Sequence, residues 1–456
     1  MSVEDPETYL RRFAETQLRR LAAGEVTAAE CAAHVDSVAV AFEETGALDG
    51  QVTSHVTEHL HVALMARATS PGSGPMGRSA LRGRPGFADL FARQRSRTQV
   101  PEGPTGEVSV VPATAALHLR KDDGDEDIYL LGYTTVPGRA WLSVAARTSQ
   151  PLVPRRHASP PSARNPRALQ SNRYRPTFAG GGIVAIDDTG RGYTLGFAGG
   201  GGDWYIGRLT LNPVPASGTA WLEVRCGGES VRLDLRAKSP AADVTVQSLA
   251  GTPGENYLRR QAESLIGSPE SAEGPLRARA TGLSDAVPAL RAVGLLPPDS
   301  PVPGEVAALF ESLGGPGELI AVPGRSPAQW VAGRDSEFPP QTSVTVAAGS
   351  LAVALPEADG VAVHLTAVLT RPDAGTWIFG GIRMTADSGE PAFWLRDDTN
   401  SWHSVSVRGM SGQGGDYAFQ AAVVPPLTPE TSQVELHVTG KTTEVRATIP
   451  VRWWLS

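Results

Sequence analysis

An internal repeat limits the folds open to this chain more than any other feature of its sequence. The segment at residues 7–15 shares Tyr-Leu-Arg-Arg with the segment at 255–263, and Asp-Asp-Thr occurs at 187–189 and again at 397–399. Gly-Asp-Trp at 202–204 corresponds to Gly-Asp-Tyr at 415–417, and Val-Arg occurs at 231–232 and 445–446. Because these matches follow one order, residues 1–250 and 251–456 are predicted to be two copies of one plan. A feature that the shared scaffold needs is expected in both copies, and a specialised site in one.

Each copy begins with a pattern typical of helices. Asp5 before Pro6 is an N-cap with proline in the first turn, and Thr27 with Glu30 has the spacing of a capping box. Apolar residues recur at intervals of three and four through residues 6–67, and the corresponding segment of the second copy lies near 254–313. We therefore predict a small unit of three packed helices at the start of each copy.

The rest of each copy is predicted to be antiparallel β structure. Apolar and polar residues alternate near residues 108–119 and again near 344–355, with turn residues at short intervals afterwards. A late hairpin is predicted to pair residues 204–211 with residues 219–225. A parallel sheet would require a helix after each strand, and the pattern contains none. We therefore expect an α+β multidomain protein in which a helical unit followed by an antiparallel β-sandwich occurs twice.

The predicted organisation has six segments. Two of them, rich in Gly, Pro, Ser and Arg, have the composition of linkers. The segments are a helical unit at 1–68, a linker at 69–105, a sandwich at 106–250 with an Arg- and Pro-rich insertion at 147–176, a helical unit at 251–313, a linker at 314–340 and a sandwich at 341–456.

The turn around the Asp-Asp pair resembles a known kind of module. Ile-Asp-Asp-Thr-Gly at 186–190, followed by Tyr193 and by the proline-rich stretch 213–215, is similar to immunoglobulin-like modules of uncharacterised bacterial proteins. The second copy departs from this pattern, with Asn400 in place of the glycine and His403 in place of the tyrosine. The resemblance implies an immunoglobulin-like sandwich in each copy and implies no activity. Because aspartates bond nearby backbone amides in turns, both Asp pairs are predicted to be turn residues rather than acids and bases.

Composition bears on compartment and partners. No apolar run approaches the roughly 20 residues that span a bilayer, so no membrane partner is expected. The acidic N-terminus lacks the pattern of a signal peptide, and the cysteines, Cys31 and Cys226, occupy unrelated positions, which predicts a cytoplasmic protein. Basic residues are nearly all arginine, as in the high-GC genomes of actinobacteria. The net charge of −7 arises in the second copy, which is therefore not expected to bind polyanions.

The sharpest local motif lies on the third predicted helix. His55 and His59 share a helix face and could both bind one zinc ion, with Glu58 as a general base. The unit is small for a catalytic cleft, and the aligned second copy has no histidine there. We therefore favour a solvated helix face beside a Val56 and Leu60 core stripe, and we expect no cofactor. A zinc-dependent hydrolase is the first alternative function.

The arginine-rich insertion occurs in the first copy alone and contains no acidic residue. Phosphate backbones and acidic protein surfaces both attract such a segment. The candidate binding residues within it are Arg155, Arg156, Arg164, Arg167, Arg173 and Arg175. Nucleic-acid binding through the arginines of the first copy is the second alternative function.

Two tryptophans flank the Asp-Asp turn of the second copy. Trp394 and Trp402 could pair across strands or form a platform for a partner's side chain. Modules in tandem suit binding or assembly, because recognition is usually carried by the loops and faces of a rigid scaffold. The sequence therefore predicts a non-catalytic, cytoplasmic binding or scaffold protein with an unidentified protein partner. The arginine-rich insertion and the two tryptophans are its predicted contact surfaces.

Overall fold

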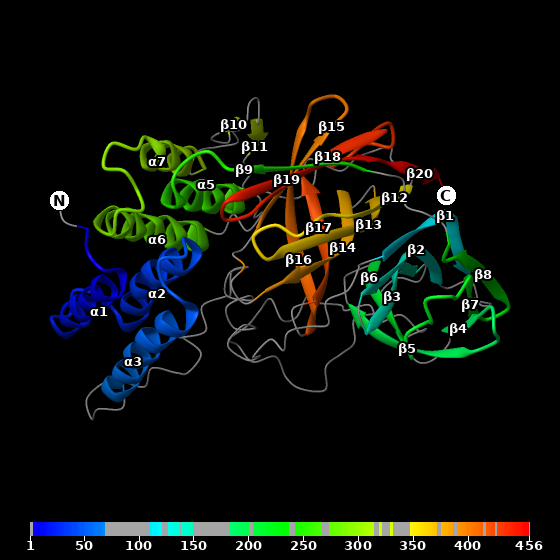
Figure 1. The fold of residues 1–456 in the computed structure, drawn as a ribbon, viewed down its shortest axis with the longest axis horizontal. Helices are drawn as coiled ribbons and strands as arrows, with labels where there is room; N and C mark the ends of the chain where they lie inside the picture. The colour runs from blue at the N-terminus through cyan, green and yellow to red at the C-terminus, as the bar shows by residue number, and fades with distance from the viewer. Residues whose placement is uncertain are drawn as a thin grey trace.

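A computed structural model shows six helices and two large antiparallel sheets within the residues it describes (Figure 1). These residues are 3–68, 109–120, 126–136, 138–148, 183–199, 204–236, 242–266, 273–313, 319–321, 329–331, 347–371, 375–385, 388, 391–413, 416–424 and 426–455. The mixed α+β class predicted from the sequence is confirmed. The immunoglobulin-like character of the sheets and the duplication stay predictions.

Three helices open each half of the chain. They are α1 (Pro6–Ala22), α2 (Ala28–Glu44) and α3 (Gly50–Ala68), then α5 (Pro253–Ile266), α6 (Glu273–Ala292) and α7 (Val302–Leu313). Their starts follow the sequence signals, because Asp5 accepts a hydrogen bond from the Thr8 amide and Thr27 with Glu30 forms a reciprocal capping box. Within the described residues, none of these helices contains a stretch that is both long and apolar enough to cross a membrane.

The second helices of the two halves end alike. Gly46 after α2 and Gly294 after α6 have φ of 72° and 76°, a left-handed conformation that glycine adopts without steric cost. In both places the leucine two residues later donates its amide hydrogen to a carbonyl in the last helical turn, at 3.2 Å. Matching turn chemistry therefore stops both helices.

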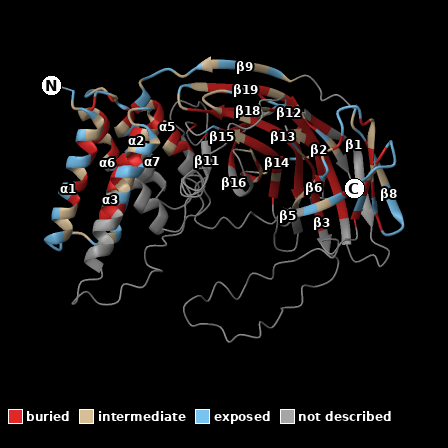
Figure 2. Ribbon diagram, turned by 60° about the horizontal axis from the view of Figure 1, so that its bottom comes forward, coloured by how far each residue is buried: buried red, intermediate tan, exposed pale blue. Residues whose placement is uncertain are grey.

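The helices of the two halves share one core (Figure 2). Leu10 and Phe42 of the first half and Leu258 and Leu290 of the second are all fully buried in it. Helices α2 and α6 contact each other directly, and His34 on α2 meets Asp285 on α6. The six helices therefore form a single body rather than two separate units.

The first sheet comes from the first half alone. Its strands are β1 (Ser109–Arg120), β2 (Glu126–Val136), β3 (Arg139–Thr148), β4 (Ile183–Asp187), β5 (Gly192–Gly199), β6 (Trp204–Asn212), β7 (Trp221–Cys226) and β8 (Glu229–Asp234). They lie in the order β1-β2-β3-β6-β5-β4-β7-β8, and all pairs are antiparallel. Because β1 and β8 also contact each other, the sheet curls into a barrel-like form around an apolar core.

The second sheet forms a half-barrel next to the helices (Figure 1). Its strands are β9 (Asp243–Ser248), β12 (Ala347–Ala354), β13 (Val361–Arg371), β14 (Gly375–Met384), β15 (Ala392–Asp397), β16 (Trp402–Gln413), β17 (Asp416–Val424), β18 (Gln433–Thr439), β19 (Thr443–Pro450) and β20 (Arg452–Leu455). Their order is β20-β12-β13-β14-β17-β16-β15-β18-β19-β9. Without the edge strands β9 and β20, this order repeats that of the first sheet strand for strand.

The two sheets pack against each other through a small apolar and polar interface. Thr134 of β2 and Thr366 of β13 are hydrogen-bonded through their hydroxyls at 3.2 Å, and both are fully buried. The ring of Trp141 on β3 lies 5.8 Å from the ring of His364 on β13. Burial, with Arg383 nearby, lowers the pKa of His364 to about 3, so this histidine is neutral at pH 7.

Several strands differ from the sequence expectation. The predicted hairpin of residues 204–211 with 219–225 is wrong, because β6 lies between β3 and β5 while β7 pairs with β4 and β8. Strands β4, β5 and β6 form a meander that ends beside β3, and β7 starts again on the other side of β4. Strand β9 lies within residues 106–250 but pairs with β19 of the second sheet. The short strands β10 (Leu319–Ala321) and β11 (Gln329–Val331) pair within the segment that composition assigned to a linker.

Candidate functional site

The two tryptophans proposed as contact residues lie where the helices meet the second sheet. Trp394 on β15 is 1% exposed and Trp402 on β16 is 7% exposed. Their rings pack edge to face with centroids 6.4 Å apart, and both belong to the core of the helices. The cross-strand aromatic pair is therefore present, and it is covered from within the chain. Its binding of an outside partner stays a prediction.

A buried polar cluster on the second sheet adjoins these tryptophans. His437 on β18 lies 4.8 Å from the ring of Trp402, centroid to centroid. Its Nε2 is 2.7 Å from Glu435, and its Nδ1 is 3.3 Å from Glu444. Glu444 also accepts a hydrogen bond from Gln247 on β9 at 2.8 Å. These contacts join β18, β19 and β9, so the cluster helps to hold the three strands together.

Sequence reasoning missed this cluster, although a signal for it exists. Glu435, His437 and Thr439 occupy every second position of β18, and side chains two apart in a strand share one face. That alternation predicts a polar face, and polar faces of antiparallel sheets usually contact water. Only the position of helix α5 against β15 shows that this face is covered.

Helix α5 joins the second sheet through its polar side. Asn256, Arg260 and Glu263, spaced by about one turn each, are all less than a tenth exposed. Arg260 donates to the Gly440 carbonyl in the turn between β18 and β19 at 2.8 Å, and it forms an ion pair with Glu44 of α2 at 2.6 Å. One side chain therefore connects α5, α2 and the second sheet.

The corresponding face of the first sheet is open. Trp394 pairs with His437 across β15 and β18, and Val184 holds the same place in β4, opposite Arg225 of β7. Val184 is 46% exposed, and Arg225 is exposed as well. We call this surface, on β4, β7 and β8, the outer face of the first sheet. Its residues are Val184, Ile186, Trp221, Glu223, Arg225 and Arg232.

The outer face combines apolar and charged groups. Glu223 accepts a hydrogen bond from Arg225 at 2.7 Å, and the guanidinium of Arg232 lies 3.8 Å from the centre of the Trp221 ring. Val184 and Ile186 lie on the adjacent strand. An aromatic ring and aliphatic side chains with arginines around them are typical of protein contact surfaces. Sequence reasoning did not single out this face, because only comparison with the covered face of the second sheet distinguishes it.

The Asp-Asp pairs build the same turn in both sheets. Asp187 accepts hydrogen bonds from the hydroxyl and amide of Thr189, from the amide of Arg191 and from the Tyr193 hydroxyl. Burial by itself raises the pKa of Asp187, but these hydrogen bonds bring it down to about 2. Burial, together with the hydrogen bond to Asp187, raises the pKa of Tyr193 to about 12. Both groups are therefore held in the states that the turn requires.

In the second sheet, Asp397 accepts the same bonds from Thr399 and from the Ser401 amide, and His403 lies 3.3 Å from it in place of the tyrosine. Asn400 has φ of 65°, close to the 79° of Gly190 at the same position of the first turn. Asparagine is among the few residues that adopt this left-handed conformation readily. The contacts of both aspartates are those of turn residues.

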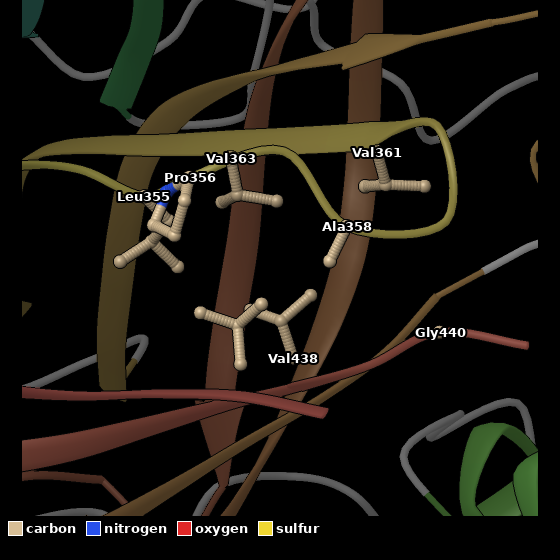
Figure 3. A pocket seen from close by; sticks show the side chains of 8 residues that line it. Leu355, Pro356, Ala358, Val361, Val363, Val438 and Gly440 are labelled. Atoms are coloured by element: carbon tan, nitrogen blue, oxygen red, sulfur yellow. The ribbon is translucent and has the colours of Figure 1, made fainter. Parts of the chain in front are cut away.

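A small apolar hollow lies inside the half-barrel (Figure 3). It opens between the turn before β13 and the turn between β18 and β19, and its free volume is about 10 Å³. Val361, Val363 and Val438 are among the side chains that point into it. That volume is about what one water molecule needs, and the walls offer no polar side chain to hold one. The hollow is therefore a packing defect rather than a ligand site.

The remaining sequence candidates lie partly or wholly outside the described residues. Val56 and Leu60 are buried in the helical core as the predicted stripe requires, and His55 is exposed on the same helix. The side chain of His59 lies outside the described residues, as do the six candidate arginines of the insertion. Across the part of the chain that the structure describes, no three His, Cys, Asp or Glu side chains gather in a way that could hold a metal ion.

The chain was compared with known proteins in three ways. No protein-family model matches it, and no curated protein matches it. Among solved structures, it is matched with a Bacillus anthracis protein whose title reads "the crystal structure of the conserved domain protein". That match has 8% sequence identity and a TM-score of 0.19, and it covers 81% of this chain and 85% of the other.

Proposed function

We propose that this chain is a non-catalytic binding or scaffold protein that contacts a protein partner through the outer face of the first sheet. The observation that carries the proposal is the contrast between two corresponding sheet positions. Trp394 of the second sheet lies under helix α5 and is 1% exposed, whereas Val184 of the first sheet is 46% exposed. A large exposed apolar side chain opposite Arg225, on a face that also carries Trp221 and Arg232, fits a contact surface better than a solvated one.

The two faces correspond to each other because, as we also propose, the chain contains an internal duplication. It is supported by the shared strand order and by contacts that recur with exchanged partners. In the helix repeat, His34 corresponds to Gly282 and Ser37 to Asp285. His34 meets Asp285, and a side chain built at Gly282 would collide with Ser37. Such reciprocal contacts are expected where two similar units pack about a two-fold axis.

The sheets support the same proposal. The pairing of β2 with β3 shifts register between Leu130 and Gly132, and the pairing of β13 with β14 shifts at the corresponding point, between Leu365 and Ala367. Because a β-bulge re-aims the side chains that follow it, a bulge at the same place in two sheets favours a common origin. The immunoglobulin-like resemblance of the individual sheets stays a prediction.

Two further parts of the sequence interpretation are carried as proposals. The cytoplasmic location is supported by Cys31 and Cys226, which are buried in two different cores, that of the helices and that of the first sheet. The actinobacterial origin depends on composition alone. The arginine-rich insertion stays a candidate second contact segment, for an acidic protein surface or for nucleic acid.

The proposed contact surface can be tested with two matched valines. Val184 on the outer face and Val246 on edge strand β9 are 46% and 52% exposed, so aspartate at either place is expected to leave the fold intact. The full chain and the two variants would be tagged and purified from the native host, and bound proteins, including the host's untagged copy of the chain, would be quantified by mass spectrometry. We expect a stoichiometric protein to be lost from Val184→Asp and kept by Val246→Asp. The proposal fails if no bound protein distinguishes the two variants.

A further inference from the structure

Helices α1 and α5 use one side in the same way and the opposite side differently. Tyr9, Leu10 and Ala14 of α1 are buried in the helical core, as are the corresponding Tyr257, Leu258 and Ala262 of α5. The polar sides of the two helices also correspond, with Thr8, Arg12 and Glu15 in the places of Asn256, Arg260 and Glu263. On α5 these three residues are buried against the second sheet and α2, whereas on α1 all three are exposed.

The first sheet keeps the acceptor that α5 uses on the second. Arg260 donates to the Gly440 carbonyl, in the turn that joins β18 to β19. Gly228 follows β7 in the turn to β8 as Gly440 follows β18, although the first hairpin is shorter: its last pair is Cys226 with Glu229, whereas β18 and β19 continue to Thr439 with Glu444. Arg12 on α1 corresponds to Arg260 on α5. A carbonyl oxygen has two lone pairs, so the Gly228 carbonyl can accept from an arginine in addition to a contact that it already makes. A helix arginine and a glycine carbonyl in the turn after the corresponding strand therefore occur in both halves.

The two members do not meet within one chain. Helix α1 lies at one end of the long axis of the molecule and strands β7 and β8 at the other (Figure 1), and Figure 2 shows the same separation of α1 from β8. The second sheet stands between them and contacts the helices on one side and the first sheet on the other. Among the residues that the structure describes, none covers the polar side of α1 or the outer face of the first sheet.

We infer that α1 of one copy of this chain binds the outer face of the first sheet of a second copy, as α5 binds the second sheet within each chain. The inference depends on the proposed binding function and names its partner. The two surfaces differ, so the contact is head-to-tail: two copies either bind reciprocally and close as a dimer, or continue as a chain. In the contact, Arg12 donates to the Gly228 carbonyl, and the aliphatic parts of the side chains on α1 cover Val184 and Ile186.

The experiment measures self-association of the full chain by sedimentation velocity over a range of concentrations. Arg12→Glu removes the donor on the helix, and Val184→Asp places a carboxylate on the apolar part of the sheet face. Each variant alone is expected to self-associate on the order of tenfold more weakly than the unaltered chain. Arg19→Glu on α1 and Val246→Asp on β9 are matched controls and are expected to associate like the unaltered chain.

An equimolar mixture of the two variants gives the sharper test. The Arg12→Glu chain keeps an intact sheet face and the Val184→Asp chain keeps an intact helix, so the mixture should form a 1:1 dimer that neither variant forms alone. A monomeric unaltered chain, association that both variants retain, or a mixture without dimer would each overturn the inference. A monomeric chain that nevertheless loses another protein partner on Val184→Asp would overturn only the identity of the partner and leave the proposed function standing.

Discussion

The ion pair between Arg260 and Glu44 is expected to contribute far more to stability than an exposed pair with the same geometry. Nη2 of Arg260 lies 2.6 Å from Oε2 of Glu44, and the two side chains are 2% and 8% exposed. Arg11 and Glu7 on α1 are 2.5 Å apart, but their side chains are 51% and 40% exposed. Since the distances are nearly equal, burial is the variable that separates the two pairs.

The magnitudes follow from what each substitution leaves behind. Arg260→Leu leaves the Glu44 carboxylate in the core without that guanidinium, which lowers the free energy of unfolding by about 3–5 kcal/mol. The hydrogen bond to the Gly440 carbonyl is lost as well, for about 1 kcal/mol. Arg11→Leu removes an exposed pair one helical turn apart and changes the same quantity by about 0.3–0.5 kcal/mol. Replacing both Arg260 and Glu44 by leucine should restore most of the stability lost with Arg260 alone.

Urea denaturation followed by tryptophan fluorescence measures these differences, because Trp394 and Trp402 lie in the core to which α5 belongs. Variants are compared only where the dependence of the free energy on urea is unchanged. The reasoning is refuted if Arg260→Leu costs less than about 1 kcal/mol, the upper range for exposed pairs. It is refuted equally if the double leucine variant is less stable than Arg260→Leu.

Three further predictions concern the sheets. Burial and Arg383 lower the pKa of His364 from 6.5 to about 3. The contribution of neutral His364 to stability is therefore present above pH 6.5 and is lost as the pH falls toward 3. Thermal unfolding of His364→Leu should therefore depend less on pH across that window than unfolding of the unaltered chain. Asp187→Asn should lower the pKa of Tyr193 from about 12 toward its ordinary 10, as read from an ultraviolet titration of tyrosinate, and Asp397→Asn should leave it unchanged. Gly380→Ala places a Cβ 2.2 Å from the His364 carbonyl oxygen and should destabilise the chain by about 1–3 kcal/mol. At Gly192 a Cβ meets open space, so Gly192→Ala should change stability by less than about 0.5 kcal/mol in the same urea assay.

Local signals in the sequence predicted the helices well and the strand pairing poorly. The Asp5 cap, the Thr27 capping box and Gly46 depend on neighbours within one turn, so their patterns are legible in the chain, and the structure has all three. Strand pairing depends on partners far apart in sequence. A rule that favours adjacent strands as partners therefore misplaced β6, whose neighbours are β3 and β5.

The candidate surfaces required information that periodicity does not contain. Trp394 and Val184 occupy corresponding places on two sheets of the same strand order, and nothing within either strand says that a helix covers one of them. Trp394 and Trp402 are large aromatic residues near a turn, and large aromatic residues occur in cores as well as on recognition surfaces. Their burial follows from α5, which lies more than a hundred residues away in the sequence.

The proposed duplication gives the difference between the two faces a physical reading. A contact between a helix and a sheet stabilises a chain only when both members belong to the same molecule or to a bound partner. In the second half the contact is internal, and the face has acquired Trp394, Trp402 and His437, large groups that suit permanent burial. At corresponding places the first half has Val184, Gly192 and Arg225, which tolerate water. Under the proposed self-association, the outer face of the first sheet contacts water in the free chain and protein in the bound one. Two exposed tryptophans would promote aggregation of the free chain, whereas a smaller apolar patch with arginines around it stays soluble and can still bind.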